Sequence, residues 1–346
     1  MIHLAIVGAG WAGTRQAQAI QELRSAGRDR FVIECLVDND PEFLRAKAAE
    51  LGVAKTYARL EDALRDPDVT AVSICSPHNL HCPQTLDALS ASRHVLVEKP
   101  MATSVGDATR MIDAAKRHGI SLYVAENLAY APMTRFLAAF LGGPGGSPIG
   151  EIAFAVVANG FRAPNFGYEG RRAWLTQPDL GGTGTWMLHG VHSMAQLRQV
   201  LGEVSVVYLR EHKTRSYVPR DIEGTLAGTL VMRDGFCVNI AQTSEARFPK
   251  SLGGYVVHGD RGSVRAGKDA CEVFSFDAEE PERFEYETGL SEYAREMEAF
   301  ADHVEGIAPG PTDGISERRS LAIVLAGYES MRAGAPIDLC EMFGEL

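Results

Sequence analysis

Residues 6–13, which read IVGAGWAG, decide the fold. They place the spacing G-x-G-x-x-G at the end of an apolar run typical of a strand and at the start of an amphipathic run typical of a helix. Gly8 permits a tight turn, Gly10 lets the backbone approach a pyrophosphate, and Gly13 lets the helix pack closely on the strand. The first N–H groups of the helix and its dipole favour phosphates. The motif therefore predicts a dinucleotide site, which also includes Trp11 and Ala12.

The first 126 residues alternate short apolar runs with amphipathic stretches. This pattern predicts a parallel sheet covered by helices on both faces. Right-handed crossovers then give a doubly wound α/β fold. The expected strands are residues 2–7, 31–37, 69–74, 94–98 and 120–125, and the expected helices are residues 12–25, 41–51, 60–66, 82–91 and 105–118.

A different pattern follows residue 126. After one more helix and a loop rich in glycine and proline, runs of strands with turn signals predict an α/β domain on a large, mostly antiparallel open sheet. The expected strands are residues 151–159, 204–211, 225–233, 236–243, 254–258 and 271–276, and the expected helices are residues 131–141, 185–200, 291–305 and 316–333. We expect two domains, residues 1–126 and residues 127–346.

Asp38 closes the second expected strand of the first domain. A carboxylate at this place accepts hydrogen bonds from the ribose hydroxyls of a dinucleotide and repels a 2′-phosphate. The alternative is a helix N-cap before Pro41, a role that Asp40 suits better. No arginine stands immediately beside Asp38, so NAD is expected, with NADP the less favoured cofactor.

Composition narrows the class of protein further. The 346 residues carry a net charge of −11, which argues against sequence-independent binding to nucleic acid. No apolar run approaches the ~20 residues that cross a bilayer, and the N-terminus lacks the basic segment of a signal peptide. Six cysteines without a C-x-x-C pair are typical of reduced thiols in the cytoplasm. We expect a cytoplasmic protein without membrane or nucleic-acid partners.

Residues 98–100, EKP, end the fourth expected strand. Ligands of open α/β sheets bind beyond the carboxyl ends of the strands, so Glu98 and Lys99 are expected where a nicotinamide meets its substrate. In general, a partly desolvated lysine beside an oxidised nicotinamide has a lowered pKa and can exchange a proton with a hydroxyl. The alternative is a solvated Glu98–Lys99 pair at a strand end.

Taken together, these motifs resemble the Gfo/Idh/MocA oxidoreductase family. The resemblance covers nearly the whole chain and rests on the glycine motif, Ser76-Pro77 with His81, the EKP element, and the later GGTG at 181–184 with His192. It implies an N-terminal NAD(P)-binding Rossmann domain and a C-terminal domain that binds substrate and oligomerises through its open sheet. A homodimer or homotetramer is therefore expected, as is a cis Lys99–Pro100 bond.

The resemblance also implies an activity and its residues. The expected enzyme is an NAD(P)-dependent dehydrogenase acting on a CH–OH group of a sugar, cyclitol or related cyclic alcohol, with Lys99 as catalytic acid/base and His192 near the reacting hydroxyl. The implied cofactor contacts are Gly8, Gly10, Trp11, Ala12, Gly13, Asp38, Ser76, Pro77, His81, Glu98, Lys99 and Asn127. The implied substrate contacts are Lys99, Tyr130, Arg162, Trp174, His189 and His192. His81 also fits a residue that simply caps the next helix.

One position departs from the family pattern. Many relatives carry D-x-G-x-H, but this chain has Leu188 where that aspartate stands. His189 lies three residues before His192 and can share its helical face. Either His189 replaces the carboxylate as a catalytic hydrogen-bond partner or proton relay, or it points into the domain and Lys99 and His192 work alone. Neither H-x-x-H pair has a carboxylate at ligand spacing, so no metal is expected.

Two alternatives to net dehydrogenation stay open. Some relatives oxidise their substrate transiently and recycle a bound NAD during glycoside cleavage or epimerisation. The other alternative is a non-catalytic NAD sensor, which Leu188 favours but which Lys99 and His192 argue against.

Overall fold

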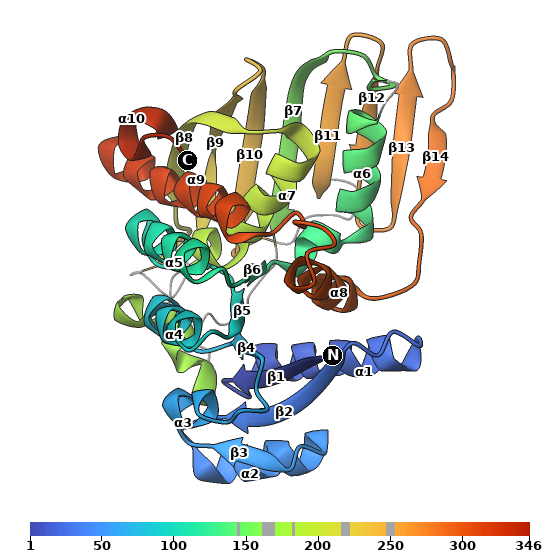
Figure 1. Cartoon of the computed structure of the whole chain (residues 1–346). Helices are drawn as coiled ribbons and strands as arrows, with labels where there is room; N and C mark the ends of the chain where they lie inside the picture. The colour runs from blue at the N-terminus through green and yellow to red at the C-terminus, as the bar shows by residue number, and fades with distance from the viewer. Residues whose placement is uncertain (144–145, 161–169, 182–183, 216–221, 247–252) are drawn as a thin grey trace. The chain divides into compact units, whose positions relative to one another are not determined.

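A computed structural model describes residues 1–143, 146–160, 170–181, 184–215, 222–246 and 253–346. The chain forms two compact units (Figure 1). The first consists of Met1–Tyr130, Asp179–Gly181 and Leu290–Arg318, and the second consists of Ala131–Pro178, Gly182–Gly289 and Arg319–Leu346.

The first unit contains a six-stranded parallel sheet in the order β3-β2-β1-β4-β5-β6. Its strands are β1 (Ile2–Val7), β2 (Phe31–Val37), β3 (Lys55–Tyr57), β4 (Ala71–Ile74), β5 (His94–Glu98) and β6 (Leu122–Ala125). The order in which strands are added changes direction beside β1: β2 and β3 lie on one side of it, and β4, β5 and β6 lie on the other. Doubly wound folds bind dinucleotides at this switch point. The predicted fold is confirmed. The sequence missed β3, because three residues reading KTY carry almost no apolar signal.

Helices cover this sheet. They are α1 (Trp11–Ser25), α2 (Pro41–Leu51), α3 (Leu60–Leu64), α4 (His78–Ser90), α5 (Val105–His118), the 3₁₀ turn η1 (Asn127–Tyr130) and α8 (Glu292–Val304). The predicted start of α4 at residue 82 is wrong, since the helix begins directly after Pro77 and contains Pro83. The fixed φ of Pro77 suits a helix start, so Pro83 does not mark the first turn.

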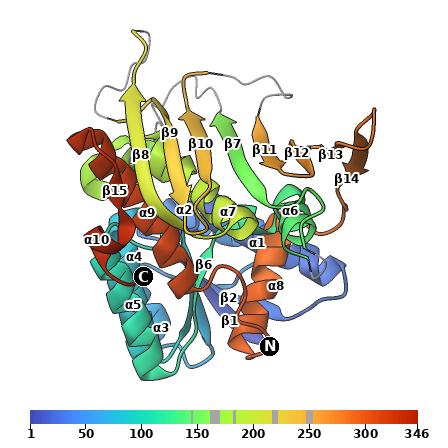
Figure 2. The same ribbon diagram turned by 90° about the horizontal axis from the view of Figure 1, so that it is seen from above.

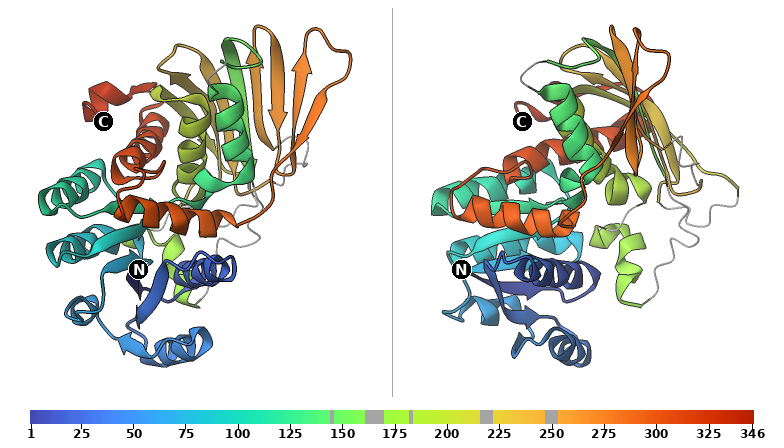
Figure 3. Two further views of the ribbon diagram at one scale, coloured as in Figure 1. Left: turned by 45° about the vertical axis from the view of Figure 1, so that its right-hand side comes forward. Right: turned by 90° about the vertical axis from the view of Figure 1, so that its right-hand side faces the viewer.

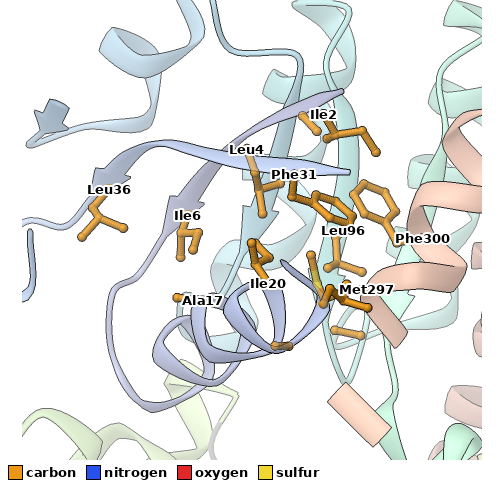
Figure 4. Close-up of a cluster of buried hydrophobic side chains, with 14 of the residues drawn as sticks. Ile2, Leu4, Ile6, Ala17, Ile20, Phe31, Leu36, Leu96, Met297 and Phe300 are labelled. Carbon is orange, nitrogen blue, oxygen red and sulfur yellow. The ribbon is translucent and has the colours of Figure 1, made fainter. Parts of the chain in front are cut away.

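Helix α8 belongs to the first unit, although the division at residue 126 would group it with the second domain. Its buried stripe includes Met297 and Phe300, spaced to face one side of a helix. The Phe300 ring stacks on that of Phe31 with centroids 6.4 Å apart. Figure 4 shows both side chains within one cluster that also contains residues of β1 and α1. The hydrophobic core of the first unit therefore needs a segment from near the end of the chain.

The second unit contains a nine-stranded sheet in the order β14-β13-β12-β11-β7-β10-β9-β8-β15 (Figure 2). Among the described strands of this sheet, only β7 and β10 pair in parallel, so the sheet is mixed and mostly antiparallel, as predicted. The strands are β7 (Ile152–Gly160), β8 (Val204–His212), β9 (Thr225–Met232), β10 (Cys237–Thr243), β11 (Gly254–Gly259), β12 (Gly262–Ala266), β13 (Ala270–Ser275), β14 (Glu282–Glu285) and β15 (Ile337–Asp338).

Helices α6 (Pro132–Gly142) and α7 (Val191–Leu201) cover one face of this sheet (Figure 3). The side chains beneath them, such as Ala155 and Val157, are buried, while Phe154 on the opposite face is exposed. Helices α9 (Gly314–Ala333) and α10 (Leu339–Phe343) complete the chain. No helix in the described ranges is both long enough and apolar enough to span a bilayer.

Candidate active site

The glycine-rich loop between β1 and α1 has the geometry that its three glycines predict. Gly8 has a φ of 87°, and a Cβ added there would lie 2.6 Å from the carbonyl oxygen of Cys75. A Cβ on Gly13 would collide with the carbonyl oxygen of Gly8 and with Ile6. By contrast, the space around Gly10 is open, which leaves room for a ligand to approach the backbone.

The N-terminus of α1 is suited to a phosphate. No described side chain caps this helix end, and its first turn holds no acidic residue. The exposed ring of Trp11 lies edge-on to Tyr293, and the Arg15 guanidinium carbon lies 5.4 Å from the centre of that ring. The N–H groups and the positive end of the helix dipole thus fit the pyrophosphate of a dinucleotide.

Asp38 is buried at the end of β2, directly beside this loop. Its carboxylate accepts hydrogen bonds from the backbone N–H of Ala9 at 3.2 Å and of Asp40 at 3.1 Å. The helix cap of α2 is Asp40, whose carboxylate accepts the Phe43 N–H. The prediction that Asp40 serves as the cap is confirmed. A contact between Asp38 and ribose hydroxyls stays a prediction.

The EKP element follows β5. Glu98 accepts hydrogen bonds from the Lys99 backbone N–H at 3.2 Å and from the Gln16 side-chain amide at 3.3 Å. Gln16 is fully buried in α1, and the Ser73 hydroxyl of β4 donates to its amide oxygen. A hydrogen-bonded chain therefore links α1, β4 and β5 beside Lys99. Sequence reasoning missed Gln16, whose only signal is a polar residue on the apolar face of α1.

Two carboxyl groups, those of Glu98 and Glu126, interact electrostatically with Lys99. The sheet register pairs Glu98 with Ala125, so Lys99 and Glu126 follow neighbouring strands at the same end of the sheet. Burial raises the pKa of Glu98 to about 7 and that of Glu126 to about 8, while the nearby Lys99 charge opposes both shifts. Glu126 is fully buried and accepts the Leu128 N–H at 3.2 Å.

The turn after β4 is tied to the EKP element by His81. The ring nitrogens of this fully buried histidine lie 2.8 Å from the carbonyl oxygen of Pro100 and 2.9 Å from that of Ser76. The Ser76 hydroxyl donates to Gln84 at 2.6 Å. The Lys99–Pro100 bond is cis, as the family resemblance implies. Whether His81 and Ser76 also contact a cofactor stays a prediction.

Asn127 and Tyr130 begin and end η1, and both are buried. The Tyr130 hydroxyl lies 2.5 Å from that of Tyr123 and 3.3 Å from that of Thr312. The Tyr130 hydroxyl thus has partners within the first unit. Its role as a substrate contact stays a prediction, as does a cofactor contact by Asn127.

In the second unit, the helix predicted at 185–200 begins with a π-helical turn (Trp186–Gly190) before α7. His189 and His192 are partly exposed, and their ring centroids lie 6.2 Å apart. Leu188 is buried. The two histidines are therefore neighbours, as their spacing predicts, and Leu188 packs into the interior of its unit.

Glu223 explains how this helix start is stabilised. Its buried carboxylate accepts the backbone N–H groups of Gly184, Trp186 and Met187 and the hydroxyl of Tyr328. It thereby satisfies several donors at a helix N-terminus, where backbone groups lack intrahelical partners. Because Glu223 comes from a distant segment, no local pattern in the sequence could reveal this contact.

The other predicted substrate contacts are distributed as follows. Trp174 lies partly buried in a 3₁₀ segment (Gly170–Thr176) of the second unit, which also holds His189 and His192. Lys99 belongs to the first unit. Arg162 lies outside the described residues.

One acidic cluster outside these motifs forms ion pairs with a lysine. The carboxylates of Glu34, Asp66 and Asp68 lie close enough together to hold a metal ion. The Lys55 ammonium, however, lies 2.6 Å, 3.0 Å and 2.8 Å from them, respectively. The cluster is therefore an ion-pair network, in which the ammonium supplies the positive charge.

Both units match known families. Residues 2–126 match the family model described as "Oxidoreductase family, NAD-binding Rossmann fold", and residues 147–265 match the model of the "GFO/IDH/MocA C-terminal domain". The glycine-rich loop, Asp38 and the N-terminus of α1, which no described side chain caps, fit the NAD-binding description. The fold and the site therefore define an NAD-binding oxidoreductase. The chain belongs to the Gfo/Idh/MocA family.

Two of the curated relatives are named for sugars or sugar derivatives. The chain is 28% identical over 301 residues to a 1,5-anhydro-D-fructose reductase of Ensifer adhaerens, with 85% of this chain and 87% of the relative covered. It is 26% identical over 346 residues to a D-xylose 1-dehydrogenase (NADP(+)) of Haloferax volcanii, with 95% and 98% covered.

Solved structures agree in fold. The aldose-aldose oxidoreductase from Caulobacter crescentus superposes with a TM-score of 0.82 at 23% identity, with 97% of this chain and 99% of that chain covered. Levoglucosan dehydrogenase in complex with NADH and levoglucosan gives a TM-score of 0.85 at 18% identity, with 98% and 99% covered. At these identities the similarity shows the fold alone.

Proposed function

We propose that this oxidoreductase is an NAD-dependent dehydrogenase that transfers a hydride between nicotinamide and the hydroxyl or carbonyl carbon of a sugar, cyclitol or related cyclic alcohol. The observation that carries the proposal is Lys99, which follows a central strand of an NAD-binding Rossmann unit and lies near the buried carboxyl of Glu126. The names of the relatives that act on 1,5-anhydro-D-fructose, D-xylose and myo-inositol support the substrate class.

In this proposal, NAD supplies the hydride acceptor, and the chain manages the proton. Lys99 takes the hydroxyl proton during oxidation and returns it during reduction. His192 donates a hydrogen bond to the reacting oxygen. His189, whose ring neighbours that of His192, takes the hydrogen-bonding role of the carboxylate that Leu188 cannot supply.

Asp38 favours NAD over NADP in this proposal. Its carboxylate is held in place by the Ala9 N–H, so a 2′-phosphate there would meet a fixed negative charge. The test of this point is the ratio of kcat/KM with NAD to kcat/KM with NADP. We expect Asp38→Ser to lower that ratio at least about tenfold, which corresponds to ~1.4 kcal/mol. An unchanged ratio would remove Asp38 from cofactor selection.

The function is tested by following nicotinamide absorbance over a panel of aldoses, polyols, inositols and cyclic diols, with NAD and NADP separately. Lys99→Ala is the matched variant, and NADH fluorescence titration shows that it still binds nucleotide. We expect turnover with one class of substrate and its loss, by about 10²-fold or more, in the variant. A tightly held nucleotide without net release of NADH would instead support an NAD-recycling enzyme, and binding without chemistry would support a sensor.

We further propose that the protein forms a homodimer or homotetramer through the uncovered face of the nine-stranded sheet. The register places Phe154 of β7 beside His258 of β11, and their rings stack 4.4 Å apart on this face. Val156 and Val256 follow on the same side, since successive side chains alternate along a strand. Light scattering on Phe154→Glu tests this, because a charge should dissociate the oligomer.

A cytoplasmic location is also part of the proposal. The described chain contains only free cysteines, and two of them, Cys237 and Cys340, are exposed. Exposed thiols suit a reducing compartment. Fractionation of the native host cells with antibody detection tests the location.

A further inference from the structure

We propose that Ser193 is a positioning residue for His189 and His192, and that it acts through a buried polar layer formed with Asn159 and Gln242 of the nine-stranded sheet. The proposal deepens the proposed function, on which it rests for the roles of the two histidines. The arrangement of the histidine rings, however, is a property of the protein without substrate and is tested separately.

Two polar side chains of the sheet lie on the face that α7 covers. Asn159 of β7 and Gln242 of β10 are register partners on adjacent strands. Because successive side chains alternate along a strand, Asn159 shares the face of Val157, and Gln242 shares the face of Ile240. Val157, Ile240 and Gln242 are all buried, as expected on the side that the helices cover (Figure 3).

Hydrogen bonds join these two strands to both ends of the segment that carries the histidines. The Asn159 Nδ2 donates to the Ser193 hydroxyl oxygen at 3.0 Å, and the Ser193 hydroxyl lies 3.0 Å from the Gln242 Oε1. The Gln242 Nε2 donates to the Thr185 hydroxyl oxygen at 3.3 Å. Thr185 immediately precedes the π-helical turn, and Ser193 immediately follows His192. The polar layer therefore holds this segment on both sides of the two histidines.

The Ser193 hydroxyl also contacts the histidine segment directly. Its oxygen lies 3.3 Å from the carbonyl oxygen of His189, four residues earlier in the chain. Serine hydroxyls in helices often donate to the carbonyl one turn earlier. A hydroxyl has a single proton, so Ser193 shares it between the His189 carbonyl and the Gln242 amide oxygen. The backbone of His189 is thus tied to the same point of the sheet as the residue that follows His192.

The directionality of hydrogen bonds gives this polar layer its effect. Thr185, Ser193 and Gln242 are 0%, 3% and 2% exposed, and buried polar groups are costly unless they form hydrogen bonds. Apolar side chains would fill the same space without this requirement. Hydrophobic attraction is non-directional, however, whereas hydrogen bonds have preferred distances and angles. A connected set of hydrogen bonds therefore fixes the rotation of α7 about its axis more closely than apolar packing alone would.

A small rotation of this helix would matter for the reaction. Side-chain tips lie about 6 Å from a helix axis, so a rotation of about 10° moves them by about 1 Å. A misplacement of about 1 Å can lower a catalysed rate by as much as about 10²-fold. Because His189 and His192 lie on the segment that Ser193 holds, loss of the Ser193 hydroxyl should displace both imidazoles.

Nuclear magnetic resonance of the protein without nucleotide or substrate tests this displacement. The chain has 10 histidines, and the Cε1–H signals of their rings are recorded after isotope labelling of histidine. Spectra of His189→Gln and His192→Gln assign the two signals. We expect Ser193→Ala to shift or broaden both signals. Asn159→Ala should do the same, and it changes a partly exposed residue, so it provides the test if Ser193→Ala does not fold.

Ser330→Ala is the matched control. Ser330 is a buried serine in a helix of the second unit, and its hydroxyl donates to the Ala335 carbonyl oxygen at 2.7 Å and accepts the Leu209 N–H at 2.9 Å. This variant loses buried hydrogen bonds outside the polar layer, so the signals of His189 and His192 should not change. Wild-type signals for both histidines in the folded Ser193→Ala and Asn159→Ala variants would overturn the proposal.

Kinetics separate positioning from loss of stability. We expect Ser193→Ala to lower kcat at least about tenfold. The Kd for NADH should stay within about twofold of the wild-type value, since the NAD-binding family model matches the first unit. Ser330→Ala should keep kcat within about twofold. An equal fall of kcat in the two variants, or no fall in Ser193→Ala, would refute positioning. If the histidine signals move as expected but the wild-type protein oxidises no substrate, the proposed function fails and the polar layer stands.

Discussion

Replacing Gln16 by leucine should loosen the link between the glycine-rich helix and the EKP element. Gln16 is fully buried, donates to Glu98 at 3.3 Å and accepts from the Ser73 hydroxyl. Leucine has a similar volume but offers neither a donor nor an acceptor. The substitution therefore removes these two hydrogen bonds, and also the one that the Cys75 thiol donates to the Gln16 amide oxygen at 3.5 Å, while leaving the packing of α1 nearly unchanged.

The expected loss of stability follows mainly from the two buried polar groups that lose a hydrogen-bond partner. A buried polar group that loses its partner costs about 1–3 kcal/mol, and here the Glu98 carboxyl and the Ser73 hydroxyl both lose one. Burial of the leucine side chain offsets part of this loss by about 1.5–3 kcal/mol. We expect a net loss of about 1–3 kcal/mol in the free energy of unfolding. The pKa of Glu98 should also rise further, because the Gln16 hydrogen bond stabilises its ionised form.

Urea denaturation monitored by circular dichroism measures this loss. Gln18→Leu is the matched control, since Gln18 lies two residues further along α1 and is exposed. We expect the control to stay within about 0.5 kcal/mol of the wild type, as is usual for surface substitutions. Equal stability of the Gln16→Leu variant and the wild type would refute the view that this hydrogen-bonded chain holds α1 to β5.

Three further substitutions probe other parts of the two units. Gly13→Ala should weaken NADH binding at least about tenfold in calorimetric titration, since its Cβ would collide with the backbone of the glycine loop. An unchanged Kd would contradict the close helix–strand contact. Glu223→Gln should lower the free energy of unfolding by about 2–4 kcal/mol, because three N–H groups and a hydroxyl share its carboxylate; a loss below about 0.5 kcal/mol would show that the cap contributes little. Finally, because the pKa of Glu126 is raised, the folded chain binds the proton of this carboxyl more tightly than the unfolded chain does. The free energy of unfolding should therefore fall as pH rises from about 5 to about 8. Urea titrations at several pH values measure this slope, and Glu126→Gln should flatten it.

Features with a local signature could be predicted from the sequence. The glycine spacing and the position of Asp38 depend on residues within one strand–turn–helix segment, and both have the expected geometry. Asp40 is the helix cap because it immediately precedes Pro41, which is again a local relation. The ends of the parallel strands could also be predicted, since near-continuous apolar runs in the sequence stop there.

Contacts between distant segments could not be predicted. Glu296 and Gln16 look like ordinary polar residues on amphipathic helices, and only the packed structure shows that their side chains are buried. Glu223 caps a helix that starts nearly forty residues earlier in the chain. The π-helical turn before α7 depends on such tertiary contacts, so periodicity alone predicted a regular α-helix.

The return of α8 to the first unit has a consequence for biosynthesis. Met297 and Phe300 fill the same core as Phe31, and Ser291 at the start of α8 donates hydrogen bonds to Glu22 of α1. During translation, the N-terminal segment therefore waits for most of the polypeptide before its last helix emerges from the ribosome. Until then its apolar surface is a target for chaperones, and a fragment ending at residue 126 should expose that surface permanently.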